Sequence, residues 1–78
     1  MIQWYKTEEK VPERGSRIML VGNKIYPHDV TANLIYDMDF FRDLQTLEEY
    51  VWEPAKRRYQ YWCYMDDFMR EVMGNENG

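Results

Sequence analysis

Residues 58–65 have the sequence Arg58-Tyr59-Gln60-Tyr61-Trp62-Cys63-Tyr64-Met65, and the alternation of their side chains is typical of a β-strand. One face of this strand would carry Tyr59, Tyr61, Cys63 and Met65, while the other face would carry Trp62 and Tyr64. Because both faces hold bulky side chains, neither face is suited to water alone. The stretch predicts a central strand that is covered on both faces, or covered on one face and used for binding on the other.

The segments on the N-terminal side of this stretch also favour strands. A short strand is expected near the N-terminus with Ile2 and Trp4 on one side, after which Thr7 is expected to cap a helical turn. Residues 17–22 predict a second strand. Residues 30–36 predict a third, in which one face carries alternate side chains, namely Val30, Ala32, Leu34 and Tyr36.

Residues 37–53 are harder to assign, and the segment 44–53 fits either a helix or a strand. Residues 37–43 are expected to be a loop that holds Phe40 and Phe41. The apolar spacing of residues 44–53 fits a helix, but Tyr50 and Trp52 favour a strand. We expect a hairpin that leads into residues 58–65, with its turn at residues 54–57 and a helical turn near residues 44–48 before it.

The period of the pattern changes after Met65, where a C-terminal helix is predicted. Two acidic residues would occupy its first turn, Gly74 would end it, and an apolar stripe would pack on the sheet: Phe68, Met69, Val72 and Met73. Residues 75–78 are expected to fray. The sequence thus predicts one α+β domain over residues 1–78, with a small antiparallel sheet of three to five strands and a C-terminal helix packed on it.

Composition and charge narrow the classes of function. The chain has 78 residues and a net charge of −4, which argues against direct nucleic-acid binding because that requires a basic face. Cys63 is the only cysteine, so an internal disulfide is excluded. No apolar run reaches the roughly 20 residues that cross a bilayer, and the N-terminal residues lack the order of a signal peptide. We therefore expect a cytoplasmic protein without a membrane partner.

The opening of the chain resembles a family of short phage and prophage proteins of unknown function. The resemblance rests on Trp4, on Pro12 and Glu13, on Gly15, and on the hydrophobic strand that includes Ile18. The C-terminal part departs from the family pattern, because the prolines that follow the last strand are absent. The resemblance implies a small α+β accessory protein of a phage or mobile element that binds a host protein in the host cytoplasm. It carries over no catalytic residue.

The residues of this opening can also be explained by their roles in the fold. Trp4 is expected to anchor the first strand, while Pro12 and Gly15 set a tight turn before the second strand. That explanation assigns these residues to the fold and not to a site.

Metal, catalytic and cofactor sites are weakly supported by the sequence. Four acids follow the spacing of a calcium loop, but Phe41 and Arg42 stand where that loop needs an oxygen ligand and a glycine. His28 and Cys63 could form a nucleophilic pair, but Cys63 lies within a strand among bulky neighbours, where an inert thiol is more usual. We therefore predict no catalytic, metal-binding or cofactor-binding residues, and a protein that is not an enzyme.

Two surfaces are candidates for binding another protein. The first, the basic–aromatic patch, combines residue types that are enriched at binding hot spots: Lys56, Arg57, Arg58, Tyr59, Tyr61, Trp62 and Tyr64. The second, the acidic surface, holds Arg42 as its only basic residue among six acids: Asp37, Asp39, Asp43, Glu48, Glu49 and Glu53.

Either surface fits a non-enzymatic protein that covers a working surface of a host protein, such as a defence or nucleic-acid enzyme. One alternative is a structural module that forms a homodimer through exposed aromatic side chains. The other is a small enzyme or ligand-binding protein that uses Cys63 or the carboxylates.

Overall fold

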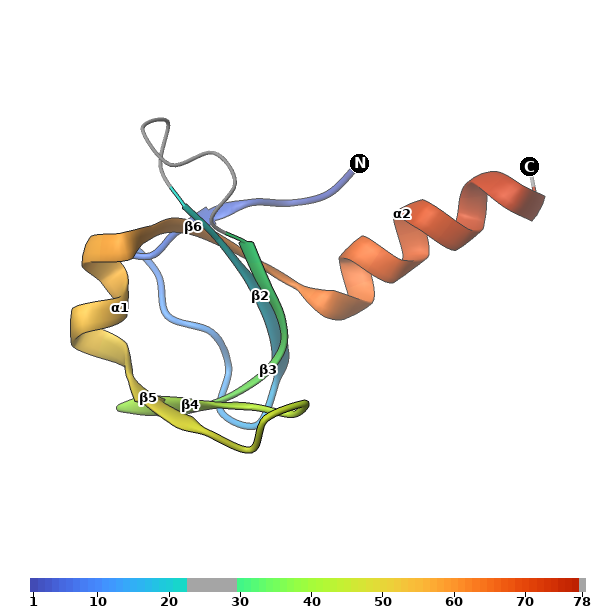
Figure 1. The fold of residues 1–78 in the computed structure, drawn as a ribbon. Helices are drawn as coiled ribbons and strands as arrows, with labels where there is room; N and C mark the ends of the chain where they lie inside the picture. Colours follow the sequence, from blue (N-terminus) through green and yellow to red (C-terminus); the bar gives the residue numbers. More distant parts are fainter. Residues whose placement is uncertain (23–29, 78) are drawn as a thin grey trace.

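The computed structural model describes residues 1–22 and 30–77 and contains one antiparallel sheet and two helices (Figure 1). The sheet has six strands in the order β1-β6-β2-β3-β4-β5, namely β1 (Tyr5–Lys6), β2 (Arg17–Gly22), β3 (Val30–Asp37), β4 (Phe40–Asp43), β5 (Glu49–Val51) and β6 (Tyr59–Tyr64). The helices are α1 (Trp52–Arg58) and α2 (Met65–Asn77). The expected α+β class is correct, but the range of three to five strands was too low.

Strand β6 lies between β1 and β2, as residues 58–65 predicted for a strand inside the sheet. The sheet curls strongly, and α1 connects β5 to β6 and packs against both (Figure 1). Neighbouring side chains of β6 enter different clusters: Trp62 lies in an inner core and Cys63 in an outer cluster, and both are fully buried. Both faces of β6 are therefore covered.

The inner core joins buried side chains from four strands and α1: Ile18, Leu20, Leu34, Tyr36, Phe41, Trp52 and Trp62. The outer cluster is smaller and lies where the first turn of α2 meets the sheet. It contains Met19, Cys63 and Met65, with Ala32 and Phe68 packed against it.

A β-bulge in β3 changes which face its side chains occupy. Ile18 pairs with Leu34 and Leu20 pairs with Thr31, so β3 carries one residue more than β2 over this interval. Asn33 has a φ of 58°, a left-handed conformation that asparagine tolerates better than most residues. As a result Ala32 packs against the outer cluster while Leu34 lies in the inner core. The predicted common face of Ala32 and Leu34 is wrong for this reason.

A second bulge lies in β6 at Gln60. Val21 pairs with Tyr61 and Gly22 pairs with Tyr59, so Gln60 is the extra residue and Tyr59 turns towards the inner core. The predicted common face of Tyr59 and Tyr61 is therefore wrong. Thr7 holds the bulge: its amide donates to the Gln60 carbonyl oxygen at 2.9 Å, and its hydroxyl donates to the Tyr59 carbonyl oxygen at 2.7 Å. Thr7 is buried and bonded to this bulge, which corrects its expected role as a helix cap.

The N-terminal strand is anchored by a different aromatic residue from the one expected. Trp4 is 39 % exposed, whereas Tyr5 stacks on Trp62 with ring centroids 4.6 Å apart. Tyr5 pairs with Trp62 in the β1–β6 register, which places the two rings on one face of the sheet. Gly15 has a φ of 82°, so the turn before β2 uses the conformation that glycine adopts without strain.

Residues 37–58 differ most from the expectation. The predicted loop at residues 37–43 is mostly strand, because Met38 and Asp39 alone connect β3 to β4. Met38 has a φ of 62°, a conformation that such a hairpin turn requires and that glycine usually supplies. β5 pairs with β4 and not with β6, and the expected turn at residues 54–57 is part of α1. Pro54 fits the first turn of α1, where an amide needs no partner within the helix.

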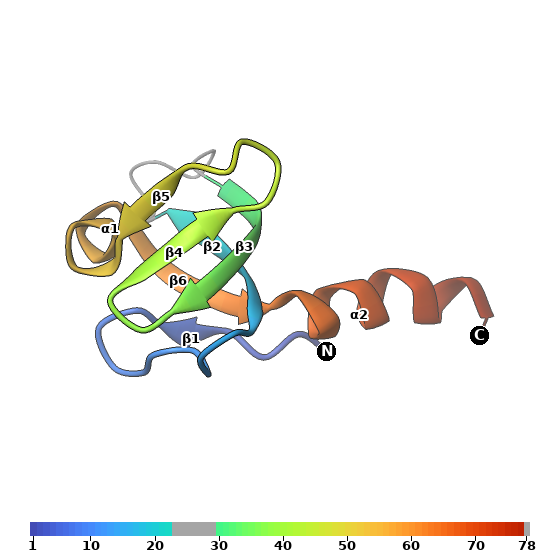
Figure 2. The ribbon, with the colours of Figure 1, turned by 90° about the horizontal axis from the view of Figure 1, so that it is seen from below.

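Helix α2 stands away from the sheet, and only its first turn packs on it (Figure 2). Met65 is buried and Phe68 is half-buried against the outer cluster. The rest of the predicted stripe is about half exposed: Met69, Val72 and Met73. The prediction that the whole stripe packs on the sheet is wrong. The charged amino group of Met1 pairs with the Glu71 carboxylate at 2.7 Å, which holds the start of the chain beside α2.

We expect Met65 and Met73 to differ sharply in their effect on stability. Met65→Ala should lower the free energy of unfolding by about 2 kcal/mol or more, because it leaves a cavity in the outer cluster. Met73→Ala should change it by less than about 0.5 kcal/mol, as is usual for an exposed site. Urea denaturation of both variants measures these values. A large loss in Met73→Ala would show that the end of α2 is docked.

Candidate functional site

The structure removes Trp62 from the predicted basic–aromatic patch. Its side chain is fully buried, and its indole nitrogen donates to the Lys10 carbonyl oxygen at 2.8 Å. Tyr64 is half-buried against the inner core, and its hydroxyl accepts from the Glu13 amide at 3.2 Å. These two aromatic side chains hold the fold together. The alternating pattern of β6 could not predict the burial of Trp62 and Tyr64, because it does not show which strand lies beside β6.

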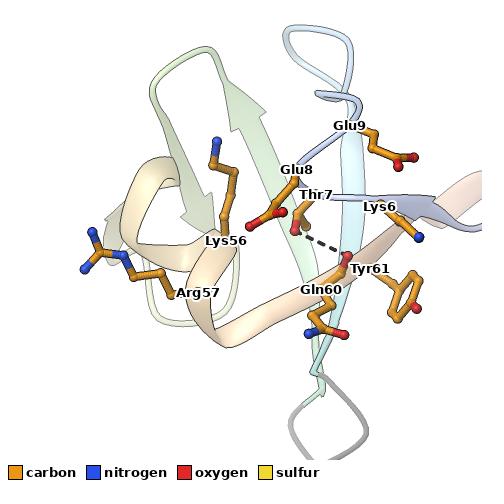
Figure 3. A pocket seen from close by; sticks show the side chains of 8 residues that line it. All are labelled: Lys6, Thr7, Glu8, Glu9, Lys56, Arg57, Gln60 and Tyr61. Atoms are coloured by element: carbon orange, nitrogen blue, oxygen red, sulfur yellow. Dashed lines mark hydrogen bonds between the residues drawn. The ribbon is translucent and has the colours of Figure 1, made fainter.

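The remaining residues of the patch lie on two sides of α1. Lys56, Arg57 and Tyr61 line a polar cavity of about 320 Å³, together with residues of the β1 turn such as Glu8 (Figure 3). The charged ends of Lys56 and Arg57 point in different directions and do not converge on one point (Figure 3). The Lys56 ammonium also pairs with the Glu53 carboxylate at 3.2 Å. The two basic side chains of the patch therefore do not act together on one group of a ligand in this cavity.

Arg58 and Tyr59 line a second cavity on the other side of α1, which we call the β5–α1 groove. Its volume is about 310 Å³, close to the lower limit for ligand pockets. It is lined by residues from four strands and α1: Thr31, Phe41, Asp43, Tyr50, Val51, Pro54, Ala55, Arg58 and Tyr59. The groove therefore combines two residues of the basic–aromatic patch with one acid of the acidic surface.

Two exposed residues of β5 line one side of the groove. Tyr50 is 41 % exposed and Val51 is 59 % exposed. The Tyr50 ring stacks on the buried Phe41 ring with centroids 5.4 Å apart, which fixes its position against the inner core. On the opposite side, the Arg58 guanidinium lies 5.4 Å from the centre of the Tyr59 ring. The sequence signal that could have located this wall is the β-favouring pair Tyr50 and Val51 at the end of an acidic stretch.

Most carboxylates of the acidic surface have local partners. Asp37 pairs with Arg14 at 2.9 Å, and Glu49 pairs with Arg42 at 3.0 Å. The Asp43 carboxylate accepts from the amides of Gln45 and Thr46, and Glu48 accepts from the Tyr50 hydroxyl. Asp39 lies in the β3–β4 turn. The acids thus support the β4–β5 region and do not form one cluster.

The acids nevertheless make the β4–β5 region electrically negative. The pKa of Tyr36 is raised first by burial and then by the charges of Asp39 and Glu53. The pKa of Tyr50 is raised first by its hydrogen bond to Glu48, with smaller contributions that include the charges of Glu48 and Asp43. The pKa values of both tyrosines are therefore raised mainly by burial or by a hydrogen bond, and the nearby negative charges add to the shift.

No group of three or more metal-ligating side chains occurs in residues 1–22 and 30–77. Three acids of the calcium-like spacing, Asp37, Asp43 and Glu48, have the other partners described above. His28 lies outside the described residues, and the His28–Cys63 pair that the sequence supports only weakly does too. Cys63 is fully buried, and burial together with the charge of Asp67 raises the pKa of its thiol to about 11. A buried thiol of high pKa is a poor nucleophile.

The raised pKa of Cys63 predicts a loss of stability at alkaline pH. Between about pH 9 and pH 11 the unfolded chain loses the thiol proton while the folded protein keeps it, so the free energy of unfolding should fall as pH rises. Cys63→Ala should show a shallower decline over the same interval. Urea denaturation at several pH values measures both slopes. Equal slopes would show that Cys63 ionises as readily in the folded protein as in the unfolded chain.

Comparisons of the chain with protein-family models, with curated proteins and with solved structures found no match. Within the described residues, neither helix has the length and apolar character to cross a membrane.

Proposed function

We propose that the protein is a non-enzymatic binding module that holds a segment of a partner protein in the β5–α1 groove. The observation that carries this proposal is the exposed Tyr50 ring, which stacks on the buried Phe41 ring in the wall of the groove. Exposed aromatic and apolar side chains that border a groove are the usual anchors of protein interfaces. The polar cavity on the other side of α1 offers no comparable apolar wall.

The partner that we propose is a host protein, and the mechanism is occlusion of a working surface of that protein. The resemblance of the opening residues to phage proteins supports a host partner. The small size of the groove supports recognition of one short segment, so affinity would depend on a few anchor residues.

Tyr50 and Tyr61 provide a matched test of this proposal. Tyr50→Ala removes the groove wall, whereas Tyr61→Ala removes a tyrosine on the other side of α1. With a partner isolated from host lysate, Tyr50→Ala should weaken binding by about thirtyfold, because truncating an anchor costs about 2 kcal/mol or more. Tyr61→Ala should leave the affinity unchanged. Isothermal titration calorimetry measures both values.

The reverse pattern, with Tyr61→Ala weakening binding and Tyr50→Ala silent, would place the partner on the polar side of α1. Both variants must first show the urea midpoint of the unmodified protein, so that a change in affinity is not a change in folding.

A second candidate function is self-association, which the exposed side chains of α2 favour. Met69, Val72 and Met73 leave an apolar stripe uncovered in a single chain. A mass in solution that rises from one chain to two with concentration, and that Val72→Ser returns to one chain, would support this candidate.

A further inference from the structure

The backbone of β5 has groups that point away from its neighbour. Within the described residues β5 is an end of the sheet, with β4 on its other side. Hydrogen bonds from the Asp43 amide to the Glu48 carbonyl oxygen and from the Trp52 amide to the Asp39 carbonyl oxygen bracket the β4–β5 pair. Bonded pairs alternate with non-bonded pairs in an antiparallel ladder.

The register then shows which residues of β5 form hydrogen-bonded pairs with β4 and which do not. Tyr50, opposite Phe41, falls on a bonded pair, whereas Glu49 and Val51 fall on non-bonded pairs. The amide of Val51 and the amide and carbonyl of Glu49 therefore face the edge of the sheet. The Val51 carbonyl opens α1. These backbone groups can pair with an added strand.

Charge limits which strand can pair there. Glu48 and Glu49 are exposed beside this edge, Glu53 follows at the start of α1, and Asp39 lies in the adjacent turn. A second β5 from another copy of the chain would bring like charges together, which disfavours self-pairing. Arg42 pairs with Glu49 and Lys56 pairs with Glu53, which offsets two of these four acids. The edge keeps a negative balance, with which a basic segment would gain favourable contacts.

We propose that the β5 edge takes up an extended segment of the partner protein in which basic and apolar residues alternate. Successive side chains of a strand point to opposite faces of a sheet. Apolar residues of the segment would lie on the face of Tyr50 and enter the β5–α1 groove, while its lysines or arginines would lie on the face of Glu49. This inference rests on the proposed function and specifies the chemistry of the partner.

Defined peptides test the inference without knowledge of the natural partner. The probe is a blocked, fluorescent peptide of alternating lysine and valine, and its controls are the same peptide with glutamate for lysine and a backbone N-methylated form. The lysine peptide should shift the backbone amide resonances of Glu49 and Val51. The glutamate and N-methylated peptides should bind at least about tenfold more weakly, since one lacks complementary charge and the other lacks amide donors.

Val51→Pro is the sharpest variant, because it removes the edge amide at a position where the backbone suits proline. Val51 has a φ of −77° and extended ψ, which proline adopts, and its amide does not serve the β4 ladder. Affinity for the lysine peptide should fall about tenfold, the usual size of one lost hydrogen bond with its solvation. Val51→Thr keeps the amide and the branched side chain, so the difference in affinity between Val51→Pro and Val51→Thr measures the contribution of the amide.

Several outcomes overturn the inference. They are equal affinity of Val51→Pro and Val51→Thr, equal binding of the lysine and glutamate peptides, and unmoved amide resonances of Glu49 and Val51. A dimer of the unmodified protein that Val51→Pro dissociates would assign the edge to a second copy. In each case the Tyr50→Ala result with the isolated partner still decides the proposed function separately.

Discussion

Trp62→Ala is expected to lower the free energy of unfolding by about 3–5 kcal/mol, a large part of the stability of a domain of this size. Trp62 is fully buried, its ring stacks on Tyr5 and lies 4.8 Å from the centre of the Tyr64 ring, and its indole nitrogen is bonded to the Lys10 carbonyl oxygen. Truncation would open a cavity at the centre of the inner core and release β1 from β6. The variant should be largely unfolded at moderate urea concentrations.

Trp4→Ala is the matched control, because Trp4 is an exposed tryptophan in the same part of the chain. It should change the free energy of unfolding by less than about 1 kcal/mol. Urea denaturation followed by circular dichroism measures both variants without relying on tryptophan fluorescence. If Trp62→Ala kept full stability and lost only partner binding, Trp62 would belong to a binding surface and not to the core.

Thr7→Val should cost about 1–3 kcal/mol, because it removes the hydroxyl that bonds the Tyr59 carbonyl oxygen within a buried bulge. Valine has nearly the same shape as threonine, so the change tests the hydrogen bond and not the packing. Thr7→Ser keeps the hydroxyl and should recover most of the lost stability.

The effect of Thr7→Val should also extend to the exchange of backbone amides. Hydrogen exchange at the residue 7 amide, which donates to the Gln60 carbonyl oxygen, should be faster in Thr7→Val than in Thr7→Ser. Urea denaturation gives the stability of both variants. Identical stability of the valine and serine variants would mean that the hydroxyl does not secure the bulge.

The central strands could be predicted from sequence because their patterns are local. Residues 17–22 and 30–36 fall on β2 and β3, and residues 58–65 contain β6, which lies inside the sheet as predicted. The faces of these strands were predicted less well. A single extra residue at Asn33 or Gln60 moves every following side chain to the other face. Nothing in the alternating pattern reveals a bulge, because it depends on the neighbouring strand.

Residues 37–58 show the limits of turn and helix signals. The β3–β4 hairpin places Met38 in a left-handed conformation without the glycine or asparagine that normally marks it. Helix α1 is short and contains Pro54 in its first turn. A proline is common both in turns and in the first turn of a helix, so the sequence pointed to a turn here. These elements are held by tertiary contacts such as the T-shaped contact of Trp52 with Tyr36 at 5.1 Å.

The sequence predicted some residues of the candidate site, but it did not predict how these residues are arranged in space. The basic–aromatic patch is contiguous in sequence, yet β6 buries Trp62 and α1 separates Arg57 from Arg58. The groove joins Arg58 and Tyr59 to β5, and this proximity arises from the curl of the sheet. The acidic stretch was more informative about the site than the basic–aromatic patch, since it contains β5, the strand that lines the groove.

The most direct test of the β5–α1 groove is hydrogen exchange of the full chain with and without its isolated partner. Binding in the groove predicts slower exchange at residues 49–51 and 54–59, with no change at residues 6–9 or along α2. Slower exchange confined to residues 6–9, or to α2, with residues 49–51 unchanged, would contradict the proposed binding site.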